Sequence, residues 1–252
     1  DRKSCRRDVI MIRTDIKAAV DITQRAQRNY DLSKSIPQED LDTLIYAASN
    51  SPSKQNETHY ELHVYTDQDK IRQIYNHTKK FTLIKDAGDA DNMHGVDKDG
   101  NFWQDDSRSV KNSQILSNVL FVYVRTKGQA RGMTHKTGQE NKSTQAEILY
   151  FEQLNYSIGI SVGELILSAS LLGYSTGICS ALDTTPIKNI IKSDENPTLL
   201  VGVGIPNSHL DRTQHAEVLN SDVPEKFRTG NLDDNWHFPS FNKSTKVIIN
   251  GN

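Results

Sequence analysis

The sequence predicts an α+β fold, a mixed, largely antiparallel sheet of about four strands with helices packed on both faces. Three observations favour it. Residues 119–124 are apolar at every position, which is typical of a central strand covered on both faces. Residues 144–172 form a long helical stretch whose later half is apolar all round, as in a core or an interface. Elsewhere, helical and strand patterns alternate along the chain.

The N-terminal half predicts two helices before the first strand. From Met11 apolar residues recur at helical spacing, and Pro37 begins a second helix with acidic residues in its first turn. A polar loop over residues 50–56 then leads into a half-buried strand over residues 60–65. Asp67 can cap the helix that follows.

The C-terminal half predicts two more strands and an unpaired tail. Gly173 can end the long helix, and residues 175–181 form a short strand of small residues. A helix restarts at residues 185–186, and residues 199–205 are another buried strand. Residues 246–250 read as a strand with no neighbour left in its own subunit, so we expect a domain-swapped homodimer in which tails complete each other's sheets.

We expect one domain over residues 11–252, preceded by residues 1–10 as a disordered or non-native extension. The polar stretch over residues 87–106 contains Phe102 and Trp103 and is a candidate lid that stacks on substrates. The alternative for this stretch is a mobile surface insertion.

The composition excludes several classes of function. Of the 252 residues, 30 are Lys or Arg scattered among 32 Asp or Glu, so no broad basic field attracts nucleic acid. No apolar run approaches the roughly 18–20 residues of a spanning helix, and we expect a cytoplasmic protein without membrane contact. The two cysteines lack CxxC spacing, and we expect each of the eight histidines to lie on the surface or in a loop. No metal site is expected.

Three polar clusters, taken in order, resemble the nitroreductase family. Residues 24–30, Gln-Arg-Ala-Gln-Arg-Asn-Tyr, look like the R-x-S-x-R-x-F element that holds the phosphate of FMN. Residues 48–56 are similar to the A-P-S-x-x-N loop beside the flavin ring. Residues 163–179 and 201–206 resemble the buried helix, the G-L-G strand and the late G-Y-P strand end. The resemblance extends from Met11 to about Val218.

The sequence departs from the family pattern at three places. Gln24 stands where an arginine is usual, Ala26 stands where a serine is usual, and Thr58-His59-Tyr60 replaces the common Q-P-W. These changes bear on substrate preference and on the affinity for FMN.

Arginines are the candidate ligands of the phosphate. A flavin phosphate carries close to two negative charges, and each charged hydrogen bond from a guanidinium contributes about 1.5–3 kcal/mol. Arg25 and Arg28 are three residues apart, so at a helix end they can converge on one anion. The resemblance adds Gln24 and Ala26 to this element and makes Arg212 a further phosphate cation. The alternative is solvated arginines on a helix end and in a loop.

Two further groups are candidate contacts of the flavin ring. The resemblance places Pro52, Ser53, Lys54 and Asn56 at the edge of the ring, where short polar groups can meet its N and O atoms. It also places the strand of Gly177, Ile178 and Cys179 under one flavin face, where small residues let the backbone approach. The alternatives are a plain Pro/Ser/Asn turn and a tight core strand.

The resemblance implies an FMN-dependent oxidoreductase in which NAD(P)H reduces FMN, and FMN then reduces a small-molecule acceptor such as a nitroaromatic or quinone, in ping-pong order. The cofactor carries the chemistry, so we assign no catalytic residue. Two alternatives remain open. One is related flavin chemistry, either reductive dehalogenation or flavin cleavage, and the other is a dimeric binding protein that has lost FMN.

Overall fold

The computed structural model describes residues 14–57, 59–79, 81–82, 109–126, 144–210, 212 and 248. The chain divides into two compact units, residues 1–80 with 111–217 and residues 81–110 with 218–252. All the predicted site residues belong to the first unit.

The first unit is built on a four-stranded sheet with the order β1-β4-β6-β5. The strands are β1 (Tyr60–Tyr65), β4 (Val119–Arg125), β6 (Pro197–Gly204) and β5 (Ser175–Cys179). All of these pairings are antiparallel. The α+β prediction is confirmed, and the described sheet is antiparallel throughout rather than mixed.

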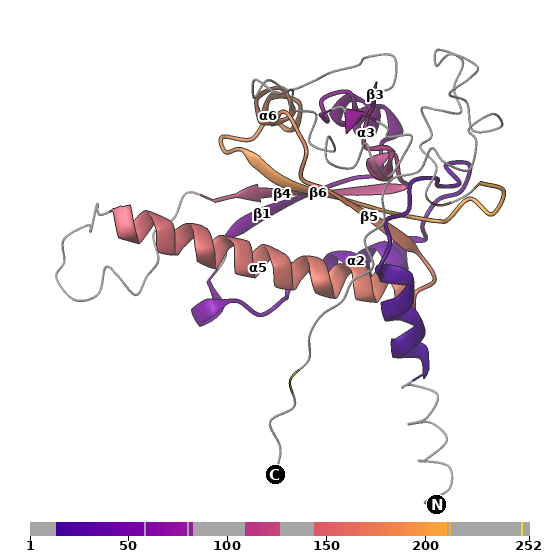
Figure 1. Cartoon of the computed structure of the whole chain (residues 1–252), viewed down its shortest axis with the longest axis horizontal. Helices are drawn as coiled ribbons and strands as arrows, with labels where there is room; N and C mark the ends of the chain where they lie inside the picture. Colours follow the sequence, from indigo (N-terminus) through magenta and orange to yellow (C-terminus); the bar gives the residue numbers. More distant parts are fainter. Residues whose placement is uncertain are drawn as a thin grey trace, which may run out of the picture. The chain divides into compact units, whose positions relative to one another are not determined.

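Helices cover both faces of this sheet, as Figure 1 shows. α2 (Gln38–Ser49) and α5 (Thr144–Leu171) pack on one face, and α3 (Gln68–Tyr75) and α6 (Thr184–Ile191) pack on the other. The central strand β4 supplies alternate residues to the two cores, which explains why it is apolar at every position. Val119, Phe121 and Tyr123 face α2 and α5, whereas Leu120, Val122 and Val124 face α3 and α6.

The ends of two helices follow the sequence signals. The Asp67 side chain accepts hydrogen bonds from the backbone N–H groups of Asp69 and Lys70, which confirms the predicted cap of α3. Gly173 follows the end of α5 with a φ of 87°, a left-handed conformation that suits glycine after a helix. Residues 14–23 form the first described helix.

The helix α5 has one buried and one exposed side. Its buried side packs on the sheet through Leu154, Ile158 and Leu165. Its other side leaves Tyr156 66% exposed and Ile160 43% exposed. By length and composition, Tyr150–Leu171 could cross a membrane, so the expectation that no run is long enough was wrong. Core helices of soluble proteins pass the same test, and α5 packs on its sheet as such a helix does.

In the second unit, β2 (Phe81–Thr82) pairs antiparallel with β3 (Ser109–Val110). Residues 1–10, the candidate lid over residues 87–106, and residues 246–250 apart from the exposed Ile248 lie outside the described residues.

Candidate functional site

The predicted phosphate segment lies at one end of the sheet, where β5 begins and β6 ends. Backbone hydrogen bonds hold it there: Gln27 N–H donates to Thr176 O over 2.8 Å, and Asp31 N–H donates to Ile205 O over 2.8 Å. Arg28 N–H donates to the carbonyl oxygen of Arg212 over 3.0 Å. Two segments that are far apart in the sequence therefore meet through their backbones and bring Arg28 and Arg212 together.

Arg28 and Arg212 form a half-buried cationic pair. Burial lowers the pKa of Arg28, Tyr30 partly opposes this shift, and the like charge of Arg212 lowers the pKa further. The Arg212 guanidinium donates to the carbonyl oxygen of Ile22 over 3.1 Å and to that of Arg25, and so closes the end of the helix over residues 14–23. An anion placed here would offset both the desolvation cost of burying Arg28 and the repulsion between the two guanidinium groups.

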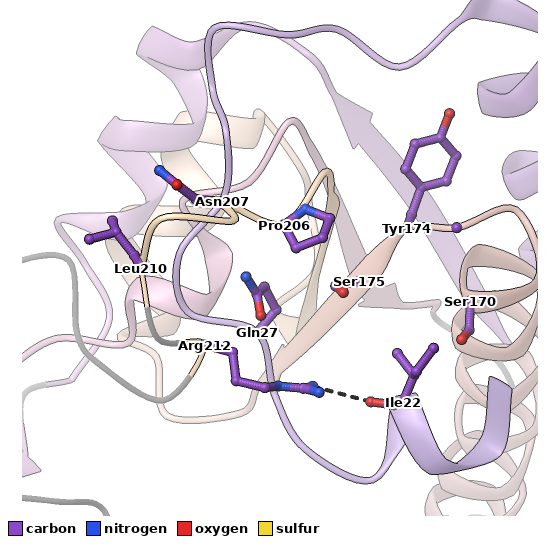
Figure 2. Close-up of a pocket in the computed structure, with 10 residues that line it drawn as sticks. Ile22, Gln27, Ser170, Tyr174, Ser175, Pro206, Asn207, Leu210 and Arg212 are labelled. Atoms are coloured by element: carbon purple, nitrogen blue, oxygen red, sulfur yellow. Dashed lines mark hydrogen bonds between the residues drawn. The ribbon is translucent and has the colours of Figure 1, made fainter. Parts of the chain in front are cut away.

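Arg212 also lines a pocket of about 290 Å³. Figure 2 shows its guanidinium directed to the carbonyl oxygen of Ile22, with Gln27, with Tyr174 and Ser175 at the entry to β5, and with Pro206 and Asn207 after β6 around the pocket. The pocket therefore adjoins the segments that carry the arginines.

The other members of the predicted phosphate element are less well placed. Gln24 is exposed, and its side chain donates to Asp21 Oδ1 over 3.0 Å. The Arg25 side chain is exposed, and Ala26 is half-buried. Of the arginines named from the sequence, the described structure thus pairs Arg28 with Arg212 in a half-buried cluster and leaves Arg25 in solvent.

The predicted ring loop has a defined conformation. Lys54–Asn56 form the 3-10 turn η1, and the Ser53 hydroxyl donates to Glu57 O over 2.6 Å. Asn56 has a φ of 56°, in the left-handed region that asparagine tolerates. Pro52 and Lys54 are exposed.

This loop and the arginine pair lie at opposite ends of the sheet. Tyr60, just after the loop, pairs with Arg125 at one end of β4, and Val119 at the other end pairs with Val203 beside the arginines. Six residue steps along a strand span on the order of 20 Å. Within one subunit, the structure does not bring the two predicted halves of the flavin site together.

The predicted flavin-face strand is closely packed against its own subunit. A Cβ at Gly177 would lie 2.5 Å from Gln114 Cβ and 2.8 Å from Gln27 O, so neighbouring groups already require glycine there. The Gln114 side-chain amide donates to Ile178 O, and the Ile178 side chain is 39% exposed. Burial raises the pKa of the Cys179 thiol to about 11, so the thiol stays protonated at neutral pH.

Several buried polar residues around these segments were not predicted from the sequence. His59 lies in the loop just before β1, as expected of a surface or loop histidine, but its side chain is only 1% exposed. Gln114, Gln27 and Asn29 are also buried. Polar residues of this kind interrupt the apolar patterns and give no signal that they are inside. Among the residues that the structure describes, no group of three or more His, Cys, Asp or Glu could hold a metal ion.

Comparisons with known proteins identify the family. The model of the nitroreductase family matches residues 23–205, more than half of the chain. No curated protein matches. Among solved structures, NfrA2 of B. megaterium has a TM-score of 0.54 at 15% identity, covering 88% of this chain and 87% of its own. Nitroreductase A of Vibrio parahaemolyticus RIMD 2210633 has a TM-score of 0.52 at 12% identity, covering 82% and 76%.

A third solved structure, the NADPH:FMN oxidoreductase of Vibrio harveyi complexed with NAD+, has a TM-score of 0.50 at 12% identity, covering 82% of this chain and 76% of its own. At these identities the likeness concerns the fold. With the family model over most of the sheet and its helices, it leads to one conclusion: the chain belongs to the nitroreductase family.

Proposed function

We propose that this chain is an FMN-dependent oxidoreductase that acts as a homodimer and uses NAD(P)H to reduce small acceptors such as nitroaromatics or quinones. Membership of the nitroreductase family supports an oxidoreductase. The half-buried pair of Arg28 and Arg212 is the observation that carries the proposal, because it gives this fold a site for the phosphate of a flavin nucleotide.

The residues present fit FMN at the phosphate end. A phosphate dianion offers several acceptor oxygens to two guanidinium groups that repel each other. Arg28 and Arg212 would hold the phosphate, with Arg25 reaching it from the solvent side and Gln24 and Ala26 completing the segment. The bound FMN would accept a hydride and pass electrons to the acceptor, which is chemistry that the side chains cannot supply.

The ring end would be formed by the loop and by β5. Pro52, Ser53, Lys54 and Asn56 would meet the edge of the ring, and Gly177, Ile178 and Cys179 would lie under one face. The Cys179 thiol, whose pKa is raised to about 11, would act there as a small protonated group and not as a nucleophile. In the proposed site, Cys179 would pack against the flavin ring.

If the loop and the arginine pair bind the same flavin, the site must be built from two subunits. The loop and the arginines of one subunit are separated by the length of β4, on the order of 20 Å, which supports a site shared between one subunit's arginines and its partner's loop. The outer side of α5 and the neighbouring α2 expose Tyr156, Ile160 and Tyr46, as a surface covered by a partner would. We also propose that residues 246–250 complete the partner's sheet.

Three further features belong to the same proposal. Residues 11–252 would act as one functional domain, residues 1–10 would be an extension of it, and residues 87–106 would close over the acceptor as a lid. Exchanging Phe102 and Trp103 for alanine should then raise the KM for the acceptor while FMN stays bound. An unchanged KM would count against the lid.

The test is a flavin titration followed by reduction. FMN is added to the purified protein, its visible spectrum is recorded, and NADH or NADPH is added under nitrogen. Bound flavin that bleaches supports the proposal, and Arg28→Ala should weaken FMN binding by about 10- to 150-fold, the cost of one charged hydrogen bond. Arg72→Ala, which removes an exposed cation on α3, is the matched control.

Failure to bind FMN at micromolar concentration would refute the proposal. It would instead favour a dimeric binding protein without flavin. Two departures favour that alternative: Gln24, whose amide donates to Asp21 at the position where the family has a phosphate arginine, and Ala26, which stands where a serine is usual.

A further inference from the structure

Three buried polar side chains connect the end of the ring loop to α5. Glu57 Oε2 lies 3.3 Å from His59 Nε2, and the two side chains are only 9% and 1% exposed. On the other side of the imidazole, Nδ1 lies 3.1 Å from the hydroxyl of Ser157, which is 2% exposed. We call Glu57, His59 and Ser157 the loop anchor.

The imidazole of His59 lies between a hydroxyl and a carboxylate. The Ser157 hydroxyl donates to Gln153 O over 2.8 Å, so toward His59 Nδ1 it can act only as an acceptor. On the other side, His59 Nε2 makes no hydrogen bond among the described residues, and its 3.3 Å contact with Glu57 Oε2 is an ion pair when the imidazole is protonated. This contact holds the carboxylate beside the imidazole inside the protein.

The resemblance of this chain of groups to a hydrolytic triad does not extend to its chemistry. A nucleophile must reach a substrate, and Ser157 and His59 are both enclosed in the core. The Ser157 proton is also directed to a backbone carbonyl and away from the imidazole. The loop anchor is thus a means of holding Glu57 inside the protein.

His59 itself is fixed independently of the loop. Its carbonyl oxygen accepts a hydrogen bond from Thr126 N–H over 3.1 Å, and the Tyr150 ring lies 5.8 Å from the imidazole, centroid to centroid. These contacts come from the chain just after β4 and from α5. The imidazole is therefore a fixed point, and the loop is attached to it through Glu57.

The Glu57 carboxylate has no second partner among the described residues that could replace His59. Its Oε1 atom is buried without a hydrogen-bond partner among the described residues. A buried carboxylate that loses its remaining partner moves to water, because leaving it unpaired in the interior costs several kcal/mol. Such a move would pull on Asn56, the next residue, and on Ser53, whose hydroxyl bonds to Glu57 O.

We infer that His59 is a positioning residue for flavin binding: by keeping Glu57 inside, it fixes Ser53 and Asn56 in the orientation that meets the flavin ring. The inference rests on the proposed function. It is specific to this chain, because His59 stands in the Thr-His-Tyr that replaces the family's Q-P-W.

A double-mutant cycle tests it in the purified full-length protein. His59→Leu removes the imidazole, Glu57→Ala removes the carboxylate, and the third variant carries both changes. For each variant, the FMN dissociation constant and the shape of the bound flavin's visible spectrum are measured, together with the Tm of the flavin-free protein. The matched control is His63→Leu in β1, where His63 lies 3.6 Å from Glu61 in a more exposed His–Glu pair that is likewise two residues apart in the sequence.

The expected result is non-additive. Each single change should weaken FMN binding by about tenfold, the equivalent of one or two neutral hydrogen bonds, and the double change should be no worse than either. Glu57→Gln, which keeps a polar side chain of the same length beside the imidazole but no charge, should lose less than Glu57→Ala. The bound flavin spectrum should shift toward that of free FMN in the affected variants, while His63→Leu binds as the wild type does.

Two results would overturn the inference alone. One is unchanged FMN affinity in Glu57→Ala, a variant that keeps the imidazole in the core and so remains informative if His59→Leu does not fold. The other is a purely structural pattern, in which Tm falls but the folded protein binds FMN with its normal affinity and spectrum. Absence of FMN binding by the wild type would overturn both this inference and the proposed function, which separates the two failures.

Discussion

The proposed division of each flavin site between two subunits can be tested by mixing two defective proteins. Arg28→Ala removes a phosphate ligand from one end of the sheet. Ser53→Ala with Asn56→Gly removes the polar side chains at the other end, and glycine keeps the positive φ of 56° at residue 56 without strain. The two ends are separated by six steps of β4, on the order of 20 Å, so neither change disturbs the other's surroundings.

The expected losses follow from the hydrogen bonds removed. Loss of Arg28 costs about 1.5–3 kcal/mol, or about 10- to 150-fold in FMN affinity. Loss of two neutral hydrogen bonds in the loop costs about 1–3 kcal/mol, or roughly 5- to 150-fold. Each homodimer therefore contains two weak sites.

Mixing should restore part of the activity. If subunits exchange freely, half of the dimers are mixed, and each mixed dimer pairs the intact arginines of one subunit with the intact loop of the other. Roughly a quarter of all sites should then bind FMN with wild-type affinity. The assay is an FMN titration, with NADH or NADPH oxidation as a second readout, on mixed dimers isolated through two different affinity tags.

The control uses two defects at the same end. A mixture of Arg28→Ala with Arg212→Ala contains no site with both arginines intact and should recover nothing. If the isolated mixed dimers of the first pair also recover nothing, each subunit builds its own site and the reasoning from the opposite ends of β4 is refuted.

Three further predictions concern the core around the site. Gly202→Ala should destabilise the protein by about 3 kcal/mol or more in urea unfolding, because its Cβ would overlap a backbone carbonyl oxygen, whereas Gly159→Ala, which meets no atom within 4 Å, should not destabilise it. Ser161→Ala should cost about 1–3 kcal/mol by the same assay, since the hydroxyl lies 2.9 Å from the buried Tyr123 hydroxyl. Cys179 should resist iodoacetamide in the native state, because burial raises its pKa from 9.0 to about 11. The native state therefore keeps a proton that the unfolded state loses, and this contribution to stability should fall as pH rises from about 9 to 11.

Local patterns in the sequence were sufficient to predict most of the described elements. The half-buried strand β1, the fully apolar β4 and the cap at Asp67 each depend on a few neighbouring residues, and the structure confirms them. Gly173 ends α5 for the same local reason. The order of the strands depends on contacts between distant segments, and no local pattern specifies it.

The candidate site was harder to predict because its geometry depends on that order. The sequence named Arg28 and Arg212 individually, but their proximity results from backbone hydrogen bonds between residues 27–31 and segments that follow residue 175. The separation of the loop from the arginines could be recognised only once both ends of β4 were assigned. His59 gave no signal at all, since one of its partners, Ser157, lies on another element.

The helix α5 shows why an apolar pattern can conceal a site. Its buried side carries Ser157 and Ser161 at a spacing of four residues, and these hydroxyls hold His59 and the carbonyl oxygen of Ala48 at the two ends of the ring loop. Its outer side exposes Tyr156 and Ile160. In the proposed dimer, one rigid helix would therefore bind the loop on one side and face the partner on the other. The distance from the loop to the partner's arginines would then be set by helix packing, which is stiff enough to hold the two halves of a flavin site in register.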